Sequence, residues 1–317
     1  MDERHYDVAV IGAGPAGMTA AMYAARALKR TALFEAKVPG GELLNTELIE
    51  DYPGFESIKG VELAQRMADH SLRFGAELVQ ARVTQVVPLP DGRHRIEVEE
   101  GPPATADAVI ITAGGVPRKL EVPGEQPYAG RGVSYCAICD GAFFRGEHLA
   151  VVGGGDAALE EAGFLTRYAS RVTVIHRRDQ FRAQPLLVAR ARANEKIDFV
   201  LDHVVEAVLG DGQRVTGLRL RDVHSQAPRE LAVGGVFVFV GFLPNTGLVA
   251  AHVDHDGQGY YRTDDVMQTS VAGIFAAGDV RAQLTRQITT AVGDATTAAV
   301  AATKYVEEEQ APRAAAG

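Results

Sequence analysis

The feature that most constrains this chain is a local pattern that occurs twice: a short apolar strand, a glycine-rich turn and an alanine-rich helix. The first strand, over residues 7–11, leads into Gly12-Ala13-Gly14-Pro15-Ala16-Gly17. The second, over residues 149–152, leads into Gly153-Gly154-Gly155-Asp156-Ala157-Ala158. Glycine allows the tight bend and lets the backbone approach a pyrophosphate, while the helix start offers free N–H groups. The repeat predicts an α/β fold with two tandem Rossmann-like dinucleotide-binding domains.

The two copies differ where their second strand ends. The first ends in Glu35, about twenty residues past the turn, where a carboxylate accepts from a ribose and repels a 2′-phosphate. The second is followed by His176, Arg177 and Arg178, with Arg182 a turn later, and guanidinium groups suit a 2′-phosphate. We therefore expect FAD or NAD at the first site and NADPH at the second. The alternatives are a purely structural turn in the first copy and a solvated basic cluster in the second. The turn residues expected to bind are Gly12, Gly14, Pro15, Ala16 and Gly17 in the first copy, and Gly153, Gly155, Asp156, Ala157 and Ala158 in the second.

The remaining segments predict how the two units are assembled. Short β-like runs broken at Pro90-Asp91-Gly92, and a hairpin-like segment over residues 199–220 around Gly210-Asp211-Gly212, indicate a β-meander inserted in each unit. After residue 245 the chain is too short for a third domain, but a strand, a Gly278-Asp279 turn and a helix over residues 291–306 would complete the first unit. We expect a discontinuous first domain. Its parts are residues 1–114 and 246–317, and residues 115–245 form the inserted domain.

The chain has two cysteines, Cys136 and Cys139, in a C-x-x-C pair. In a reducing compartment such a pair is more often catalytic than a structural disulfide, because it can close a bond and pass two electrons on. A structural disulfide and a zinc half-site are the alternatives, although zinc would need two more ligands and no histidine stands at a suitable spacing, so we expect no metal. Asp140 follows directly and is a candidate proton donor and acceptor, or else a turn or cap residue.

Composition and charge exclude several classes of function. A formal charge of −9 leaves no basic surplus for general nucleic-acid binding. The first six residues are polar and run straight into a strand, and apolar runs are too short to span a bilayer. We expect a soluble, cytoplasmic protein that does not bind nucleic acid or membranes.

Over essentially its whole length the chain resembles the low-molecular-weight, bacterial-type thioredoxin reductases, which are pyridine nucleotide-disulfide oxidoreductases. Besides the two glycine-rich turns and the C-x-x-C-D motif, the resemblance rests on several segments along the chain. They are Gly40-Gly41-Glu42-Leu43, Glu50-Asp51-Tyr52-Pro53-Gly54-Phe55, residues 176–183, residues 241–245, residues 273–280 and Arg286-Gln287. The family implies a homodimer with one FAD per subunit, an inserted NADPH domain that carries the redox cysteines, and transfer of electrons from NADPH through FAD to thioredoxin.

The resemblance also implies roles for single residues. Cys139 would lie against the flavin, Cys136 would attack the substrate disulfide, and Asp140 would transfer the proton. Because NADPH and the cysteine pair must both reach one flavin, the family rotates the inserted domain between two arrangements, and residues 114–115 and 244–245 are our candidate hinges. Further residues expected near FAD are Gly41, Glu42, Leu43, Asp51, Gly278, Asp279, Arg286 and Gln287.

Five residues depart from the family pattern without removing a catalytic group. Glu42 and Asp51 stand where glutamine and asparagine are common, Tyr135 replaces a smaller residue, and Asp294-Ala295 replaces part of a glycine-containing turn. The competing functions are a related FAD-dependent disulfide reductase or thiol oxidase acting on another substrate, a plain NADPH–flavin reductase, and a redox-sensing protein without turnover.

Overall fold

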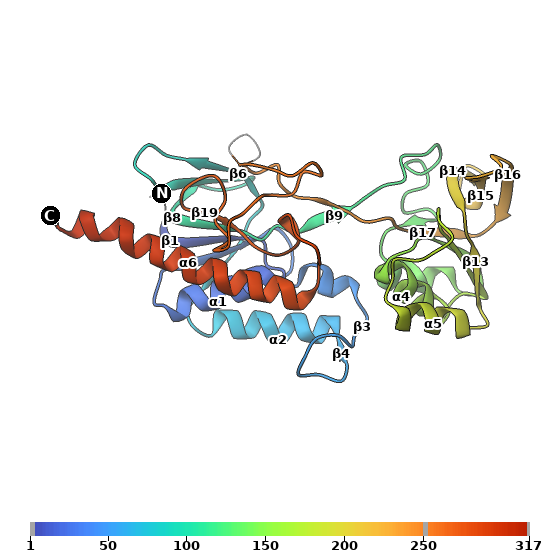
Figure 1. The fold of residues 1–317 in the computed structure, drawn as a ribbon, viewed down its shortest axis with the longest axis horizontal. Helices are drawn as coiled ribbons and strands as arrows, with labels where there is room; N and C mark the ends of the chain where they lie inside the picture. The colour runs from blue at the N-terminus through green and yellow to red at the C-terminus, as the bar shows by residue number, and fades with distance from the viewer. Residues whose placement is uncertain (1–3, 250–252, 316–317) are drawn as a thin grey trace. The chain divides into compact units, whose positions relative to one another are not determined.

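The computed structural model describes residues 4–249 and 253–315. Internal contacts divide the chain into two compact units. Unit 1 comprises residues 1–116 and 244–317, and unit 2 comprises residues 117–243 (Figure 1). The assignment of unit 1 to FAD and unit 2 to NADPH stays a prediction.

Unit 1 is built on a seven-stranded sheet with the order β5-β2-β1-β8-β7-β6, in which β19 also pairs with β8. Strands β2, β1, β8 and β19 run parallel, whereas β7 and β6 form an antiparallel extension. The segment after residue 245 thus supplies a strand of the same sheet as the N-terminal segment. The strands are β1 (Arg4–Ile11), β2 (Thr31–Glu35), β5 (Glu77–Gln80), β6 (Val83–Pro88), β7 (His94–Val98), β8 (Ala104–Ile111) and β19 (Ile274–Ala276).

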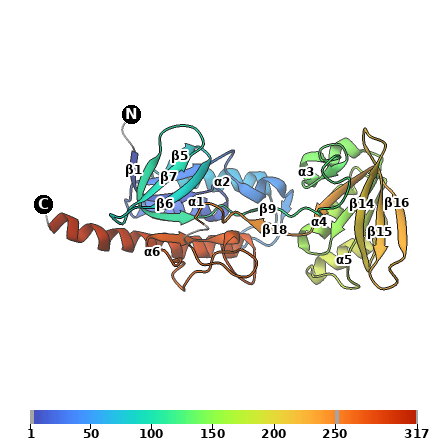
Figure 2. The same cartoon turned by 90° about the horizontal axis from the view of Figure 1, so that it is seen from above.

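Helices cover one face of this sheet: α1 (Pro15–Arg26), α2 (Gly60–Leu72) and α6 (Ile288–Ala315) (Figures 1 and 2). Alanines along α1 and α6 let the two helices pack closely, and their core includes Val8, Val10 and Ile110. Burial of such apolar side chains stabilises the layer by about 25 cal/mol per Å² of apolar area. A second core on the opposite face lies beneath the β6–β7 hairpin. Helix α6 is longer than the predicted 291–306.

Unit 2 repeats the design with a five-stranded parallel sheet of order β10-β17-β11-β12-β13. Helices α4 and α5 pack on one face, and the antiparallel sheet β14-β15-β16 packs on the other, as Figure 2 shows. The elements are β10 (Val133–Ser134), α3 (Ala137–Asp140), η2 (Gly141–Phe144), β11 (His148–Gly153), α4 (Asp156–Leu165), β12 (Arg171–Ile175), α5 (Pro185–Ala193), β13 (Ile197–Val200), β14 (His203–Gly210), β15 (Val215–Asp222), β16 (Pro228–Ala232) and β17 (Gly235–Phe239).

The predicted α/β fold class and both inserted hairpins are confirmed, with one correction. The second hairpin does not begin at Phe199, which lies in β13 of the parallel sheet; the hairpin begins at His203. Shorter elements follow no pattern visible in the sequence: η1 (Gly41–Asn45), the pair β3 (Leu48–Ile49) and β4 (Ile58–Lys59), the pair β9 (Gly115–Pro117) and β18 (Phe242–Pro244), and η3 (Gly278–Val280).

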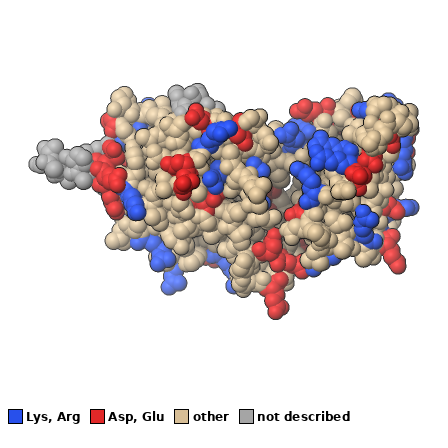
Figure 3. Space-filling view, in the orientation of Figure 1, with Lys and Arg blue, Asp and Glu red and all other residues tan. Residues whose placement is uncertain are grey.

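The surface carries both signs of charge, and the chain as a whole has a formal net charge of −9. On the face shown in Figure 3, groups of Lys and Arg alternate with groups of Asp and Glu. Among the residues that the structure describes, no helix is both long enough and apolar enough to cross a bilayer.

Candidate active site

The first glycine-rich turn joins β1 to α1 and fits a bound diphosphate. Gly12 has φ +102°, and an ideal Cβ on Gly17 would lie 1.7 Å from the Gly12 carbonyl oxygen, so both positions require glycine. A Cβ on Gly14, by contrast, would meet nothing within 4 Å. Gly14 caps α1, and Pro15 follows as its first residue, where a missing N–H costs no hydrogen bond. There is therefore open space beside the helix start, where free N–H groups favour an anion.

Two distant segments converge on the same turn. A Cβ on Gly41 would lie 3.1 Å from Gly14 Cα, and one on Gly278 would lie 3.0 Å from Ala16 Cβ. Both glycines have positive φ, +55° and +75°. The structure thus brings together three groups of predicted residues, from the N-terminal segment, from η1 and from the segment after β19. Leu43 packs into the helical core beneath η1, and Ala16 and Gly17 are buried in α1.

Glu35 ends β2 next to this turn, and its carboxylate is held by the backbone. Oε2 accepts from Ala13 N at 2.9 Å, and Oε1 accepts from Lys37 N at 2.8 Å. A carboxylate oxygen has more than one acceptor position, so the orientation is fixed while acceptor capacity remains. The geometry suits a ribose acceptor.

Carboxylates gather around the turn at Gly278. The pKa of Asp279 is raised to about 6, chiefly because the carboxyl is buried; the Arg286 guanidinium opposes the rise, and the nearby Glu42 and Asp294 carboxylates contribute to it. The Arg281 guanidinium pairs with Asp294 Oδ1 at 3.0 Å, and Asp294 Oδ2 accepts from Gly278 N at 3.3 Å. The sequence marked Asp294 only as a departure, and it missed Arg281, because this ion pair forms across the fold.

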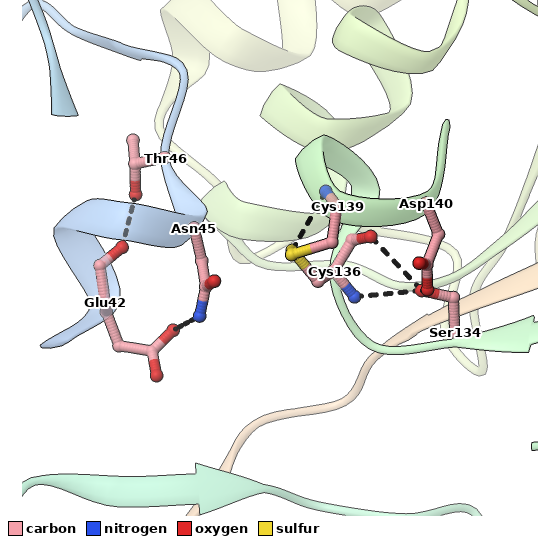
Figure 4. The surroundings of a disulfide bond; sticks show 7 residues. All are labelled: Glu42, Asn45, Thr46, Ser134, Cys136, Cys139 and Asp140. Carbon is pink, nitrogen blue, oxygen red and sulfur yellow. Dashed lines mark hydrogen bonds between the residues drawn. A yellow bond between two sulfur atoms is a disulfide. The ribbon is translucent and has the colours of Figure 1, made fainter. Parts of the chain in front are cut away.

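The other residues predicted near FAD have the following environments. Glu42 accepts a hydrogen bond from Asn45 Nδ2 at 3.1 Å, so its side chain turns back over η1 (Figure 4). The Arg286 guanidinium lies 3.9 Å from the centre of the Tyr260 ring. Gln287 precedes α6, and its N–H donates to Thr290 Oγ1 at 3.1 Å. Asp51 is exposed in the loop between β3 and β4.

The second glycine-rich turn joins β11 to α4. A Cβ on Gly153 would lie 2.4 Å from the Phe239 carbonyl oxygen, whereas one on Gly155 would meet nothing within 4 Å. Asp156 Oδ1 accepts from Gln184 N at 2.7 Å, which ties the helix start to the segment after β12. Ala157 is exposed and Ala158 is buried. The open position lies at the helix start, as in the first turn, so this turn also fits a dinucleotide.

The four residues predicted for the 2′-phosphate separate into two kinds. His176 is only 8% exposed, its ring stacks on Phe181, and a ring nitrogen lies 3.1 Å from the Gln180 carbonyl oxygen. Burial lowers the pKa of His176, with the neighbouring arginines adding to the effect, so the ring is neutral near pH 7. Arg177, Arg178 and Arg182 are exposed. The histidine thus packs beneath the segment, and the guanidinium groups are the part open to an anion.

The two cysteines form a disulfide at the start of α3, with their Cα atoms 5.4 Å apart. Cys136 is half-buried and caps the helix, Cys139 is exposed, and the Cys139 N–H donates to Cys136 Sγ at 3.2 Å. The predicted pair therefore exists as a closed bond that an external group can reach at Cys139.

Ser134 holds the candidate proton carrier beside this disulfide (Figure 4). Its Oγ donates to Asp140 Oδ2 at 2.6 Å and accepts from Cys136 N at 3.1 Å. The hydroxyl proton has a second acceptor in reach, the Cys136 carbonyl oxygen at 3.1 Å, but the carboxylate oxygen is closer and charged groups accept more strongly. Sequence reasoning assigned no role to Ser134, although its spacing of two residues before the first cysteine was visible.

Comparison with known proteins places the chain in a family. Residues 6–295 match the pyridine nucleotide-disulphide oxidoreductase family. Thioredoxin reductase from Listeria innocua is 48% identical over 97% of this chain and 96% of its own length, and that from Bacillus subtilis is 48% identical over 98% and 97%. A crystal structure of Lactococcus lactis thioredoxin reductase in the FR conformation superimposes with a TM-score of 0.94 at 46% identity, covering 96% of this chain and 99% of the other. The chain thus belongs to the pyridine nucleotide-disulphide oxidoreductases and, within them, to the thioredoxin reductases.

Proposed function

We propose that this chain transfers electrons from NADPH, through FAD and the Cys136–Cys139 disulfide, to the disulfide of a thioredoxin. The observation that carries the proposal is the closed, accessible disulfide with Asp140 held beside it. It lies in the same unit as the arginine-marked turn. The relatives described above are thioredoxin reductases, which supports the choice of acceptor.

The residues present fit both cofactors. The converging turns at Gly12–Gly17, Gly41 and Gly278, with Glu35 and Asp279, would hold FAD. The turn at Gly153–Ala158, with Arg177, Arg178 and Arg182, would hold NADPH. Bound together, the two cofactors supply the pair of electrons that opens the disulfide.

The chain's own residues then perform thiol–disulfide exchange. Once Cys136 and Cys139 are thiols, the Cys136 thiolate attacks a sulfur of the thioredoxin disulfide and forms a mixed disulfide. The Cys139 thiolate attacks Cys136 Sγ, restores the internal disulfide and releases thioredoxin as a dithiol. The two thiol protons pass to the two thioredoxin sulfurs, and Asp140 would relay them. The N–H of Cys139 at 3.2 Å from Cys136 Sγ supports Cys136 as the attacking thiolate, because it would stabilise the negative charge.

Unit 2 would turn about the two chain crossings, so that NADPH and the cysteine pair approach the flavin in turn. The positive φ of Gly114 (+57°) and Gly241 (+109°) supports a hinge there, since glycine absorbs backbone change at low cost. We further propose a cytoplasmic homodimer, as the family resemblance implies.

The substitution Cys139→Ser tests this function. Flavin reduction by NADPH should persist, because no proposed NADPH-binding residue changes, whereas thioredoxin-dependent NADPH oxidation should be lost, because no internal disulfide can form. Stopped-flow absorbance measures the first and steady-state turnover the second. Ala142→Ser, an exposed position three residues along, is the matched control and should keep both activities. Thioredoxin reduction by the Cys139→Ser variant would refute the proposed relay.

A further inference from the structure

The residue directly before the first redox cysteine is anchored to a buried acid. Tyr135 is half-buried, and its hydroxyl donates to Glu125 Oε1 at 2.8 Å. Its ring packs against the core between the two sheets of unit 2, together with Leu120 and Val122. Burial raises the pKa of Tyr135 and the Glu125 carboxylate raises it further, so the phenol stays protonated and remains a donor.

Glu125 is 3% exposed and accepts hydrogen bonds from three donors. Besides Tyr135, these are Leu120 N, 2.8 Å from Oε1, and Glu121 N, 2.6 Å from Oε2. A buried carboxylate is costly unless its oxygens are paired, and hydrogen bonds to charged groups are stronger than neutral ones. Removing one of these donors therefore loosens the chain segment to which that donor belongs.

The other two donors belong to the segment by which the chain enters unit 2. Leu120 lies three residues beyond the end of β9. Glu121 has φ +60°, a conformation that residues with a side chain rarely adopt. The carboxylate bound to its N–H holds this conformation. One buried anion thus joins the entry segment, residues 118–121, to the residue before Cys136.

We propose that Glu125 and Tyr135 form a positioning pair that fixes the redox-active loop, residues 134–140, to the entry segment of unit 2. Motion at the chain crossings is then passed to the disulfide by a rigid connection. The inference rests on the proposed function, because it assigns the pair a role in disulfide exchange. Without the phenol oxygen, the ring packing, the pairing of β10 with β17 and the Ser134 contacts remain, but the link to Glu125 is lost. A smaller fraction of molecules then presents Cys136 and Cys139 for reaction.

Tyr135→Phe in the FAD-loaded full chain tests the pair, with Tyr128→Phe as the matched control. Tyr128 packs against the same core, and its hydroxyl accepts from Gly212 N at 3.0 Å instead of contacting Glu125. Loss of one hydrogen bond to a charged acceptor corresponds to roughly tenfold faster local opening. We expect amide hydrogen exchange in residues 136–140 to be about that much faster in Tyr135→Phe and unchanged in Tyr128→Phe. The kcat with thioredoxin should fall severalfold, while the KM for NADPH stays the same.

A double variant separates a positioning role from general destabilisation. If the two residues act as a unit, adding Glu125→Gln to Tyr135→Phe should slow turnover less than the product of the two single effects predicts. The positioning role would be overturned if the two Tyr→Phe variants had equal hydrogen exchange and equal kcat. It would also be overturned if the effects of Tyr135→Phe and Glu125→Gln on turnover were strictly multiplicative. Hydrogen exchange is measured without a disulfide substrate, so it tests the pair whichever protein accepts the electrons. Absence of thioredoxin turnover in the wild-type protein would instead overturn the proposed function.

Discussion

At the scale of single residues, Asp279 gives the chain a specific dependence on pH. Its pKa in the folded state, about 6, lies above the ordinary value of 3.8 because the carboxyl is buried. Between about pH 4 and pH 6 the folded state therefore binds more protons than the unfolded state, and stability falls as the pH rises. Above pH 6 the carboxylate is charged in both states, and the cost of burying its charge lowers the stability of the fold in full.

We expect Asp279→Asn to stabilise the flavin-free protein at pH 7 by about 1–2 kcal/mol, because a neutral amide avoids that cost. The difference should vanish below pH 4, where the carboxyl is protonated in both states. Denaturant unfolding of both proteins at pH 4 and pH 7 measures it. A wild-type protein more stable than the variant at pH 7 would show that Arg286 compensates the charge completely.

At the scale of elements, two glycines of one turn should behave differently when they are replaced by alanine. Gly17→Ala places a Cβ 1.7 Å from the Gly12 oxygen, so helix and strand must separate, at a cost of about 3 kcal/mol or more. Gly14→Ala meets no protein atom within 4 Å, so stability should hold while FAD affinity falls, because the new methyl occupies the space assigned to the diphosphate. Thermal unfolding and flavin titration measure the two effects. If Gly14→Ala left the FAD affinity unchanged, the diphosphate could not occupy the space beside Gly14.

The same elements show what the sequence can and cannot predict. The strand–turn–helix units and the hairpins at Asp91 and Asp211 were predictable, because local periodicity and turn residues determine them. The partners of Asp140, Glu125 and Arg281 were not, because these side chains meet through tertiary packing. His176 illustrates the limit: its position after the strand suggested phosphate binding, yet a turn of the chain buries its ring on Phe181.

At the scale of the whole molecule, the two chain crossings between the units form a two-stranded sheet. β9 pairs with β18, and Arg118 N donates to the Gly241 oxygen at 2.8 Å. On the side of unit 1, Asn245 N donates to the Gly114 oxygen at 2.9 Å. Because the two crossings are bonded to each other, they must move together. This connection suits a unit that turns as one body, as the proposed alternation at the flavin requires.

The reaction proposed for this chain is the reduction of a thioredoxin disulfide by NADPH. The most direct measurement is steady-state oxidation of NADPH and of NADH by the FAD-loaded protein, with and without an oxidised thioredoxin. We predict oxidation that depends on thioredoxin, with kcat/KM for NADPH about tenfold or more above that for NADH, since each arginine–phosphate contact is worth roughly 1.5 kcal/mol or more. NADPH oxidation that is the same with and without thioredoxin would refute electron transfer to thioredoxin.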